Sequence, residues 1–255
     1  MKYRVLPLAT SEYSLKSLIQ LKDKDKKTPD SINLFSCAEK YLIDPIYLVD
    51  KNMSGFYKFV KGCETVDATA AFGWKAVFCN DTADDSEQSK KTEHEMIVFV
   101  SSSDGYERMC RLHSAAAISN AKGYARVDEN LLKRHWSDKD LVLAVPFYGS
   151  FLHRNCLTND SEAQYCYDWA NPTFMLEDNG IPFDGILRQE VLKFAVKYQN
   201  ETQEAQTIYY EKYKDAEAYQ ALCCKNKRTS LEKPNLDYFC SDTFCFEHWE
   251  LKNNE

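Results

Sequence analysis

The sequence predicts an α/β protein in which strands and helices alternate, a pattern typical of a parallel sheet or barrel. Residues 96–100 are an unbroken apolar run of strand length, typical of a strand covered on both faces. Residues 186–198 have the apolar spacing of an amphipathic helix. The 255 residues fit one β/α barrel or two smaller domains.

The other elements follow from the same two periodicities, read in chain order. Residues 3–8 are expected to form the first strand and residues 11–21 the first helix. The charged stretch 22–30 is interpreted as a solvated insertion, and the acidic stretch 80–93 as a flexible connection. Further strands are expected at 45–50, 70–79, 140–145 and 207–210, and further helices at 32–43, 54–63, 105–118, 128–135 and 215–224.

Composition narrows the class of protein. Apolar residues make up 44% of the chain and charged residues 28%, which is typical of a globular protein with a core. The net charge of −7 argues against a sequence-blind DNA-binding protein. The sequence has no glycine-rich phosphate loop, no signal peptide and no long apolar run. We therefore expect a cytoplasmic protein, with its ten cysteines reduced and mostly buried.

Six segments, in order, resemble the PHP domain at the N-terminus of bacterial C-family replicative DNA polymerases, the DNA polymerase III alpha subunit. The first resembles the opening HSEYS turn of that family, and the second resembles the strand that ends in TDH. The segments are SEYS at 11–14, LVD at 48–50, IVFVSSSDGYERMCRL at 97–112, RVDENLL at 126–132, NGIP at 179–182 and DAEA at 215–218.

This resemblance implies a distorted (β/α)7-type PHP barrel that forms a single domain over residues 1–255. The stretches 22–30 and 80–93 would then be insertions. Residues 225–255 would extend toward the place where a polymerase palm follows in the family. Active members of the family hydrolyse phosphoesters with metal-activated water at the mouth of the barrel.

The resemblance also shows where the metal ligands of active relatives would fall. Leucine and phenylalanine cannot bind a metal, and the ammonium group of a lysine repels a cation. We therefore predict a degenerate site with no metal, no cofactor and no catalytic residue. The positions are Leu8, Thr10, Ser17, Asp50 with the following Lys51, Lys75, Glu95, Phe147, Tyr210 and Lys212.

The three lysines at these positions would place positive charge where the family holds metal ions. We expect Lys51, Lys75 and Lys212 to pair with leftover carboxylates such as Asp50, Glu95 and Glu211. The alternative is that the alignment is shifted, or that these lysines point to solvent.

The predicted function is that of a non-catalytic module of the DNA replication machinery. It would be a scaffold or docking surface for a replicative polymerase or a proofreading exonuclease, in contact with nucleic acid only through that partner and with no membrane. Such a chain is either part of a larger polymerase or a free-standing subunit, for example of a phage. One alternative is a decoy that binds a host replisome component. Another is a metal-dependent phosphoesterase or exonuclease with an altered site made of Asp50, His94, Glu95, Asp140 and His153.

Two further constellations involve cysteine. Cys223, Cys224, Cys240, Cys245 and His248 could hold zinc, but they lack a paired C-x2-C framework, and buried thiols are the favoured interpretation. Cys37 could form a protease-like dyad with His94 or His113. It fits better as a residue on the core-facing side of a helix.

Overall fold

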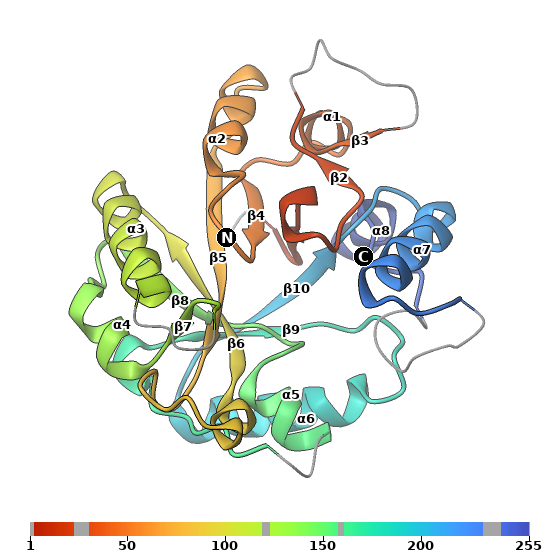
Figure 1. Ribbon diagram of the computed structural model, residues 1–255. Coiled ribbons are helices and arrows are strands. Elements are labelled where there is room, and N and C mark those ends of the chain that lie inside the picture. Colours follow the sequence, from red (N-terminus) through yellow and green to blue (C-terminus); the bar gives the residue numbers. More distant parts are fainter. Residues whose placement is uncertain (1–2, 23–30, 119–122, 158–160, 232–240, 255) are drawn as a thin grey trace. The chain divides into compact units, whose positions relative to one another are not determined.

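The computed structural model describes residues 3–22, 31–118, 123–157, 161–231 and 241–254 (Figure 1). The chain divides into two compact units. Unit 1 comprises Met1–Phe72, Glu177–Asp184 and Glu204–Glu255, and unit 2 comprises Gly73–Leu176 and Gly185–Gln203. Each unit is built from both strands and helices, which confirms the mixed α/β class.

Unit 1 is built on three parallel strands with β1 in the middle. β1 (Leu6–Ala9) pairs on one side with β4 (Ile46–Asp50) and on the other with β10 (Thr202–Ile208). Leu8 lies opposite Tyr47 on one neighbour and Thr207 on the other. A separate parallel pair joins β2 (Ile19–Gln20) to β3 (Ile32–Asn33). The parallel pairing predicted from the sequence is confirmed in this unit.

The described residues of unit 1 include four α-helices, and the last of these helices is hydrogen-bonded to Arg4 and Val5. The indole N–H of Trp249 donates to the carbonyl of Val5 at 2.7 Å, and the side-chain oxygen of Asn253 accepts from the backbone N–H of Arg4 and of Val5. These bonds satisfy backbone groups of the two residues just before β1. The helices are α1 (Leu34–Lys40), α2 (Phe56–Thr65), α7 (Ala216–Lys227) and α8 (Phe246–Asn254).

Unit 2 contains a mixed sheet in the order β9-β8-β6-β5-β7. Here β6 runs antiparallel to both β5 and β8, whereas β8 pairs with β9, and β5 with β7, in parallel. A uniformly parallel sheet is therefore wrong for this unit. The connection from β5 to β6 contains only the short 3-10 helix η2 (Glu87–Thr92), and neighbours joined without a crossover helix run antiparallel. The strands are β5 (Ala70–Phe78), β6 (His94–Val100), β7 (Arg126–Val127), β8 (Leu141–Val145) and β9 (Thr173–Leu176).

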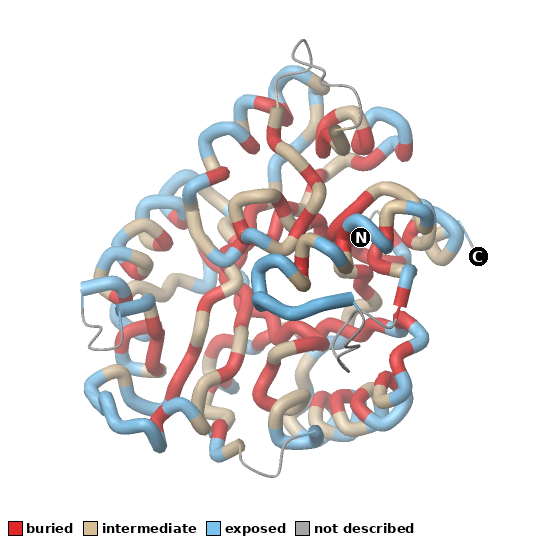
Figure 2. Tube along the Cα trace, turned by 45° about the vertical axis from the view of Figure 1, so that its right-hand side comes forward, coloured by how far each residue is buried: buried red, intermediate tan, exposed pale blue. Residues whose placement is uncertain are grey.

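The helices of unit 2 are α3 (Ser103–Ile118), α4 (Glu129–His135), α5 (Phe151–Leu157) and α6 (Asp184–Tyr198). α3 and α4 lie side by side (Figure 1), and the carboxylate of Asp128 caps α4 by accepting from the N–H of Leu131 at 2.8 Å. The strands β6, β8 and β9 are mostly buried (Figure 2). The core of this unit is therefore formed by the sheet together with the buried faces of its helices.

The helix predicted at residues 11–21 is wrong. The chain instead forms the 3-10 helix η1 (Glu12–Ser14), and Leu15 then adopts a left-handed conformation with φ 56°. The segment continues into β2, where the hydroxyl of Ser17 accepts from the N–H of Ile19 at 3.0 Å. Serine side chains that bond to nearby backbone groups compete with a helix, and here they outweigh the apolar spacing.

Other elements begin or end at residues different from those predicted, and some elements were not predicted at all. The strand expected at 207–210 lies earlier, at Thr202–Ile208, and β9, α5 and α8 were not predicted. Most of the predicted insertion 22–30, and part of the predicted extension 225–255, lie outside the described residues. Among the helices of the described ranges, none is long and apolar enough to cross a membrane.

The acidic stretch 80–93 was predicted to be a flexible connection, but the structure holds it in place. The guanidinium of Arg126, of which 1% is exposed, donates to the carbonyls of Thr82 and Asp84 at 3.1 and 3.0 Å and to the hydroxyl of Ser89 at 3.2 Å. The carboxylate of Asp128 accepts from the N–H of Thr82 at 3.0 Å. Two buried residues, Arg126 on β7 and Asp128 just after it, therefore bind this polar segment.

Candidate functional site

Two segments that carry the family resemblance meet in unit 1. Asp50 lies at the end of β4 and is fully buried. Its carboxylate accepts from the N–H of Ser11 at 2.9 Å, from the hydroxyl of Ser11 at 2.5 Å and from the hydroxyl of Ser14 at 2.7 Å. Burial raises the pKa of Asp50, although these hydrogen bonds act in the opposite direction. The SEYS turn therefore wraps a buried carboxylate.

Asp50 was predicted to pair with a lysine. In the structure its carboxylate instead accepts hydrogen bonds from Ser11 and Ser14. The next residue, Lys51, donates its backbone N–H to the hydroxyl of Ser14 at 3.0 Å, and its side chain is exposed. Glu211, the carboxylate expected near Lys212, pairs instead with Lys40 on α1 at 2.6 Å. The contacts shown for Asp50 and Glu211 are therefore with Ser11, Ser14 and Lys40, and the expected pairs with Lys51 and Lys212 are not among them.

The remaining positions of unit 1 have structural contacts. Leu8 is buried in β1, and Thr10, just after this strand, donates its backbone N–H to the carbonyl of Ile208. The hydroxyl of Ser17 donates to the carbonyl of Tyr209 at 2.9 Å. Tyr210 is fully buried, with its ring 5.3 Å from that of Tyr219. The backbone N–H of Lys212 donates to the carboxylate of Asp215 at 3.0 Å, at the start of a short 3-10 helix.

In unit 2, Lys75 and Glu95 form the ion pair that the sequence predicted. The ammonium of Lys75 lies 2.9 Å from a carboxylate oxygen of Glu95, and only 15% and 21% of the two side chains are exposed. Burial, and then the charge of Lys75, lower the pKa of His153 to about 4, against the opposing effect of Glu95. Phe147, the other predicted position in this unit, is buried just after β8. The cluster thus combines an ammonium, a carboxylate and a neutral imidazole.

A glycine brings the backbone close to this cluster. The N–H of Glu95 donates to the carbonyl of Gly149 at 2.7 Å. Gly149 has φ +80°, and a Cβ atom at this position would lie 2.4 Å from a carboxylate oxygen of Glu95. Only glycine combines this backbone conformation with so close an approach.

The residues of the alternative phosphoesterase site within unit 2 are not all brought together. His94 packs against the rings of Phe78, Phe151 and Tyr167, and burial lowers its pKa to about 4. Asp140 has other partners, the hydroxyls of Ser102 and Ser137 and the side chain of Arg108. In the described ranges, no group of three histidine, cysteine, aspartate or glutamate side chains is placed to hold a metal ion.

The cysteines of the two weaker constellations are mostly buried. Cys37 lies on the buried side of α1, as predicted, and burial raises its pKa to about 12. Its thiol is therefore protonated at neutral pH, which opposes a role as a nucleophile. The sulfur of Cys245 accepts from the N–H of His248 at 3.4 Å, and Cys223 is buried in α7. Cys240 lies outside the described residues.

Sequence reasoning missed a second buried carboxylate in unit 1. Glu177 is 2% exposed, and it accepts from the N–H of Thr207 at 2.9 Å, from the Thr207 hydroxyl at 2.7 Å and from the side-chain amide of Asn179 at 3.1 Å. Asn179 in turn accepts from the side chain of Gln206 at 2.5 Å. Asn179 begins the NGIP segment, which is the sequence signal that could have pointed here. Both oxygens of the Glu177 carboxylate accept hydrogen bonds from neighbouring residues of unit 1, which indicates a structural network.

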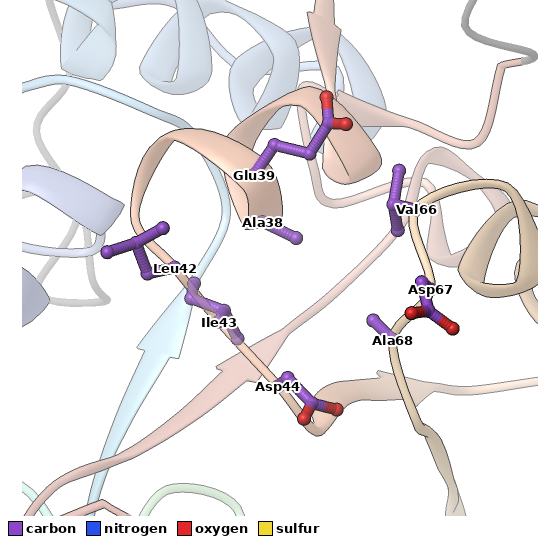
Figure 3. Close-up of a pocket in the computed structure, with 8 residues that line it drawn as sticks. All are labelled: Ala38, Glu39, Leu42, Ile43, Asp44, Val66, Asp67 and Ala68. Carbon is purple, nitrogen blue, oxygen red and sulfur yellow. The ribbon is translucent and has the colours of Figure 1, made fainter.

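Sequence reasoning also missed a hollow of about 340 Å³ in unit 1. Residues 38–44, at the end of α1 and after it, form one side, and residues 66–68, just after α2, form the other (Figure 3). No sequence pattern pointed to this feature, because it depends on how two helix ends are placed. Its lining residues are Ala38, Glu39, Leu42, Ile43, Asp44, Val66, Asp67 and Ala68.

Comparison of the sequence with models of known protein families gives no match, and comparison with curated proteins gives none either.

Proposed function

We propose that the chain is a catalytically inactive PHP-like module of the DNA replication machinery, similar to the N-terminal domain of the DNA polymerase III alpha subunit. In this proposal the chain has the distorted (β/α)7-type fold of that family. The module works in the cytoplasm of a bacterial or phage-infected cell. It is a scaffold or docking surface for a replicative polymerase or a proofreading exonuclease.

The observation that carries the proposal is the ion pair between Lys75 and Glu95. By resemblance, both residues stand at metal-ligand positions, and the ammonium of Lys75 lies 2.9 Å from the Glu95 carboxylate. A cation supplied by the chain itself thus neutralises the carboxylate that a metal would otherwise bind, and it would repel an incoming metal ion. Burial, and then the charge of Lys75, keep the nearby His153 imidazole neutral.

A second line of support comes from the apolar residues at ligand positions. Leu8 and Phe147 are buried and offer no atom that binds a metal. Tyr210 is buried beside Tyr219, where its phenol would have to lose a proton to bind a cation, and burial raises its pKa well above the ordinary value. Packing at these three positions supports a structural module rather than a hydrolase.

Two measurements test the proposal. The first is hydrolysis of 3′-labelled DNA and of p-nitrophenyl phosphate with added Mn²⁺ or Zn²⁺, for which we expect no release. Turnover that disappears in Glu95→Ala or Asp50→Ala, but persists in the exposed control Glu64→Ala, would establish the phosphoesterase alternative instead.

The second measurement is binding to purified partners. A C-family polymerase that lacks its own N-terminal module and a proofreading exonuclease are each titrated against the chain by calorimetry or by light scattering after gel filtration. We expect a stable complex with at least one of them. Absence of binding to both would refute the docking role.

A further inference from the structure

The hollow in unit 1 has the make-up of a small protein-docking site. Five of its eight lining residues are apolar, and the other three are acidic. An apolar centre with a polar rim is the usual anatomy of a protein interface, and about 300–1,000 Å³ is the usual size of a ligand-binding cavity. At about 340 Å³ the hollow is at the lower end of that range, the size for a side chain and its neighbours rather than for a large cofactor.

Leu42 makes the apolar part of this feature accessible. It lines the hollow, yet 85% of the residue is exposed, the highest value, shared with Ile118, among the large apolar residues that the structure describes as exposed. Ile43, next in the chain, is 4% exposed and forms the floor on the same side. A leucine beside a concave apolar surface is a ready contact for a second protein.

The acidic residues that line the hollow favour a partner segment that carries a basic side chain. Glu39, Asp44 and Asp67 contribute carboxylates, and none of the eight lining residues is basic. Both sides of the hollow follow the C-terminal ends of helices, α1 and α2, where the helix dipole adds negative potential. In Figure 3 Glu39 comes from the α1 side of the hollow and Asp67 from the side that follows α2, and both carboxylates lie at its outer edge.

We infer that this hollow is the docking site for a segment of a partner protein that carries an apolar side chain next to a lysine or arginine. The apolar side chain would pack on Leu42, Ile43 and Ala68, and the basic side chain would lie near the rim carboxylates. The inference deepens the proposed function and rests on it for the nature of the partner, a polymerase or exonuclease of the replication machinery.

The test uses variants that keep the backbone unstrained. Leu42 and Asp67 have φ values of 54° and 51°, a conformation that asparagine tolerates well, so Leu42→Asn and Asp67→Asn should fold. Leu15→Asn is a matched control, because Leu15 is also an exposed leucine with φ 56° in the same unit. Glu64→Gln is the control for loss of a carboxylate near the end of α2, since Glu64 does not line the hollow.

The first probe is a short fluorescent peptide of alternating leucine and lysine, titrated against the whole chain by anisotropy. We expect Leu42→Asn and Asp67→Asn each to weaken binding about tenfold, and Leu15→Asn and Glu64→Gln to change it less than about twofold. A second hollow variant, Ala68→Leu, fills the space from the other side and should give the same loss. Added salt should weaken binding to the wild type more than to Asp67→Asn.

Equal binding by the wild type and all three hollow variants, or no binding at all, would overturn the inference. The second probe, the purified polymerase and exonuclease, separates the two proposals. If one of these proteins binds the wild type and every hollow variant equally, the docking role stands and this site is wrong. If the peptide behaves as expected while neither protein binds, the docking site stands and the replicative function is wrong.

Discussion

The ammonium of Lys75 on β5 lies 2.9 Å from a carboxylate oxygen of Glu95 on the neighbouring antiparallel strand β6. Lys75 is paired in register with Ile97, so Glu95 is its diagonal neighbour on the same face of the sheet. Both side chains are mostly buried. The pair therefore differs from the exposed ion pairs on the helices of this chain, which contribute little to stability.

Replacing Lys75 by methionine should destabilise unit 2 by about 2 kcal/mol, because the Glu95 carboxylate is left without its cation in a mostly buried position. Lys75→Glu should cost more, since it places a second carboxylate beside the first. Urea midpoints measure both effects. Lys61→Met is the matched control, because Lys61 pairs with Glu64 at an exposed position, and we expect its urea midpoint to match that of the wild type. If both Lys75 variants match the wild type, the charge-replacement idea is wrong.

Gly149→Ala should be more harmful than an ordinary glycine replacement. The new methyl group would meet the Glu95 carboxylate at 2.4 Å, and the backbone would hold alanine at φ +80°. We expect a loss of about 3 kcal/mol in the free energy of unfolding, against about 1 kcal/mol for Gly180→Ala, where φ is +68° but the space is open.

A double-mutant cycle identifies the cause of the Gly149 effect. In the Glu95→Ala background the steric conflict is gone, so Gly149→Ala should then cost about as much as Gly180→Ala. An unchanged cost in that background would show that the carboxylate is not what limits this position.

The Lys75–Glu95 contact could be predicted from the sequence, whereas the contacts of Asp50 could not. The first was expected from the resemblance, which places both residues at metal-ligand positions, and not from the strand pairing that brings them together. The second depends on a turn in which Leu15 is left-handed and the hydroxyls of Ser11 and Ser14 reach the carboxylate. Apolar spacing cannot report such local bonds, and for the same reason it misplaced a helix over residues 11–21.

The class of fold was predictable because buried strands are apolar runs, but strand direction was not. The antiparallel placement of β6 depends on the connection 79–93, whose polar residues suggested only a loop. The hollow near Leu42 could not be predicted from the sequence either, because it lies between the segments that end two helices. In both cases the deciding factor is the relative position of elements, which composition and periodicity do not encode.

Arg126→Met should make the segment 80–93 more accessible to a protease. The guanidinium of Arg126 makes three hydrogen bonds to this segment, two of them to backbone carbonyls, and methionine can make none. Leaving these acceptors unpaired should cost roughly 3 kcal/mol. Trypsin should then cut faster at Lys90 or Lys91. Arg111→Met is the control, because Arg111 forms an exposed pair with Glu107, and it should leave the cleavage rate unchanged. Equal cleavage rates for both variants and the wild type would show that the hydrogen bonds of Arg126 do not protect the segment 80–93.

His94 should make the protein sensitive to acid. Burial lowers the pKa of His94 from 6.5 to about 4, and its Nε2 atom has no hydrogen-bond partner among the described residues. Between these two values the unfolded chain binds a proton that the folded chain excludes. Stability should therefore be highest above pH 6.5 and fall as the pH drops toward 4, by up to about 1.4 kcal/mol per pH unit for this group.

Phenylalanine in place of His94 isolates that contribution. It keeps an aromatic ring against Phe78, Phe151 and Tyr167 but cannot bind a proton. Urea midpoints measured across this pH range should fall less steeply for His94→Phe than for the wild type. His135→Gln, which replaces a histidine in the last turn of α4, should change the slope less than His94→Phe, because burial also lowers the pKa of His135 but less than that of His94. Parallel curves for His94→Phe and the wild type would show that His94 is protonated equally in the folded and unfolded states, and its aromatic surroundings would then have no effect on its charge.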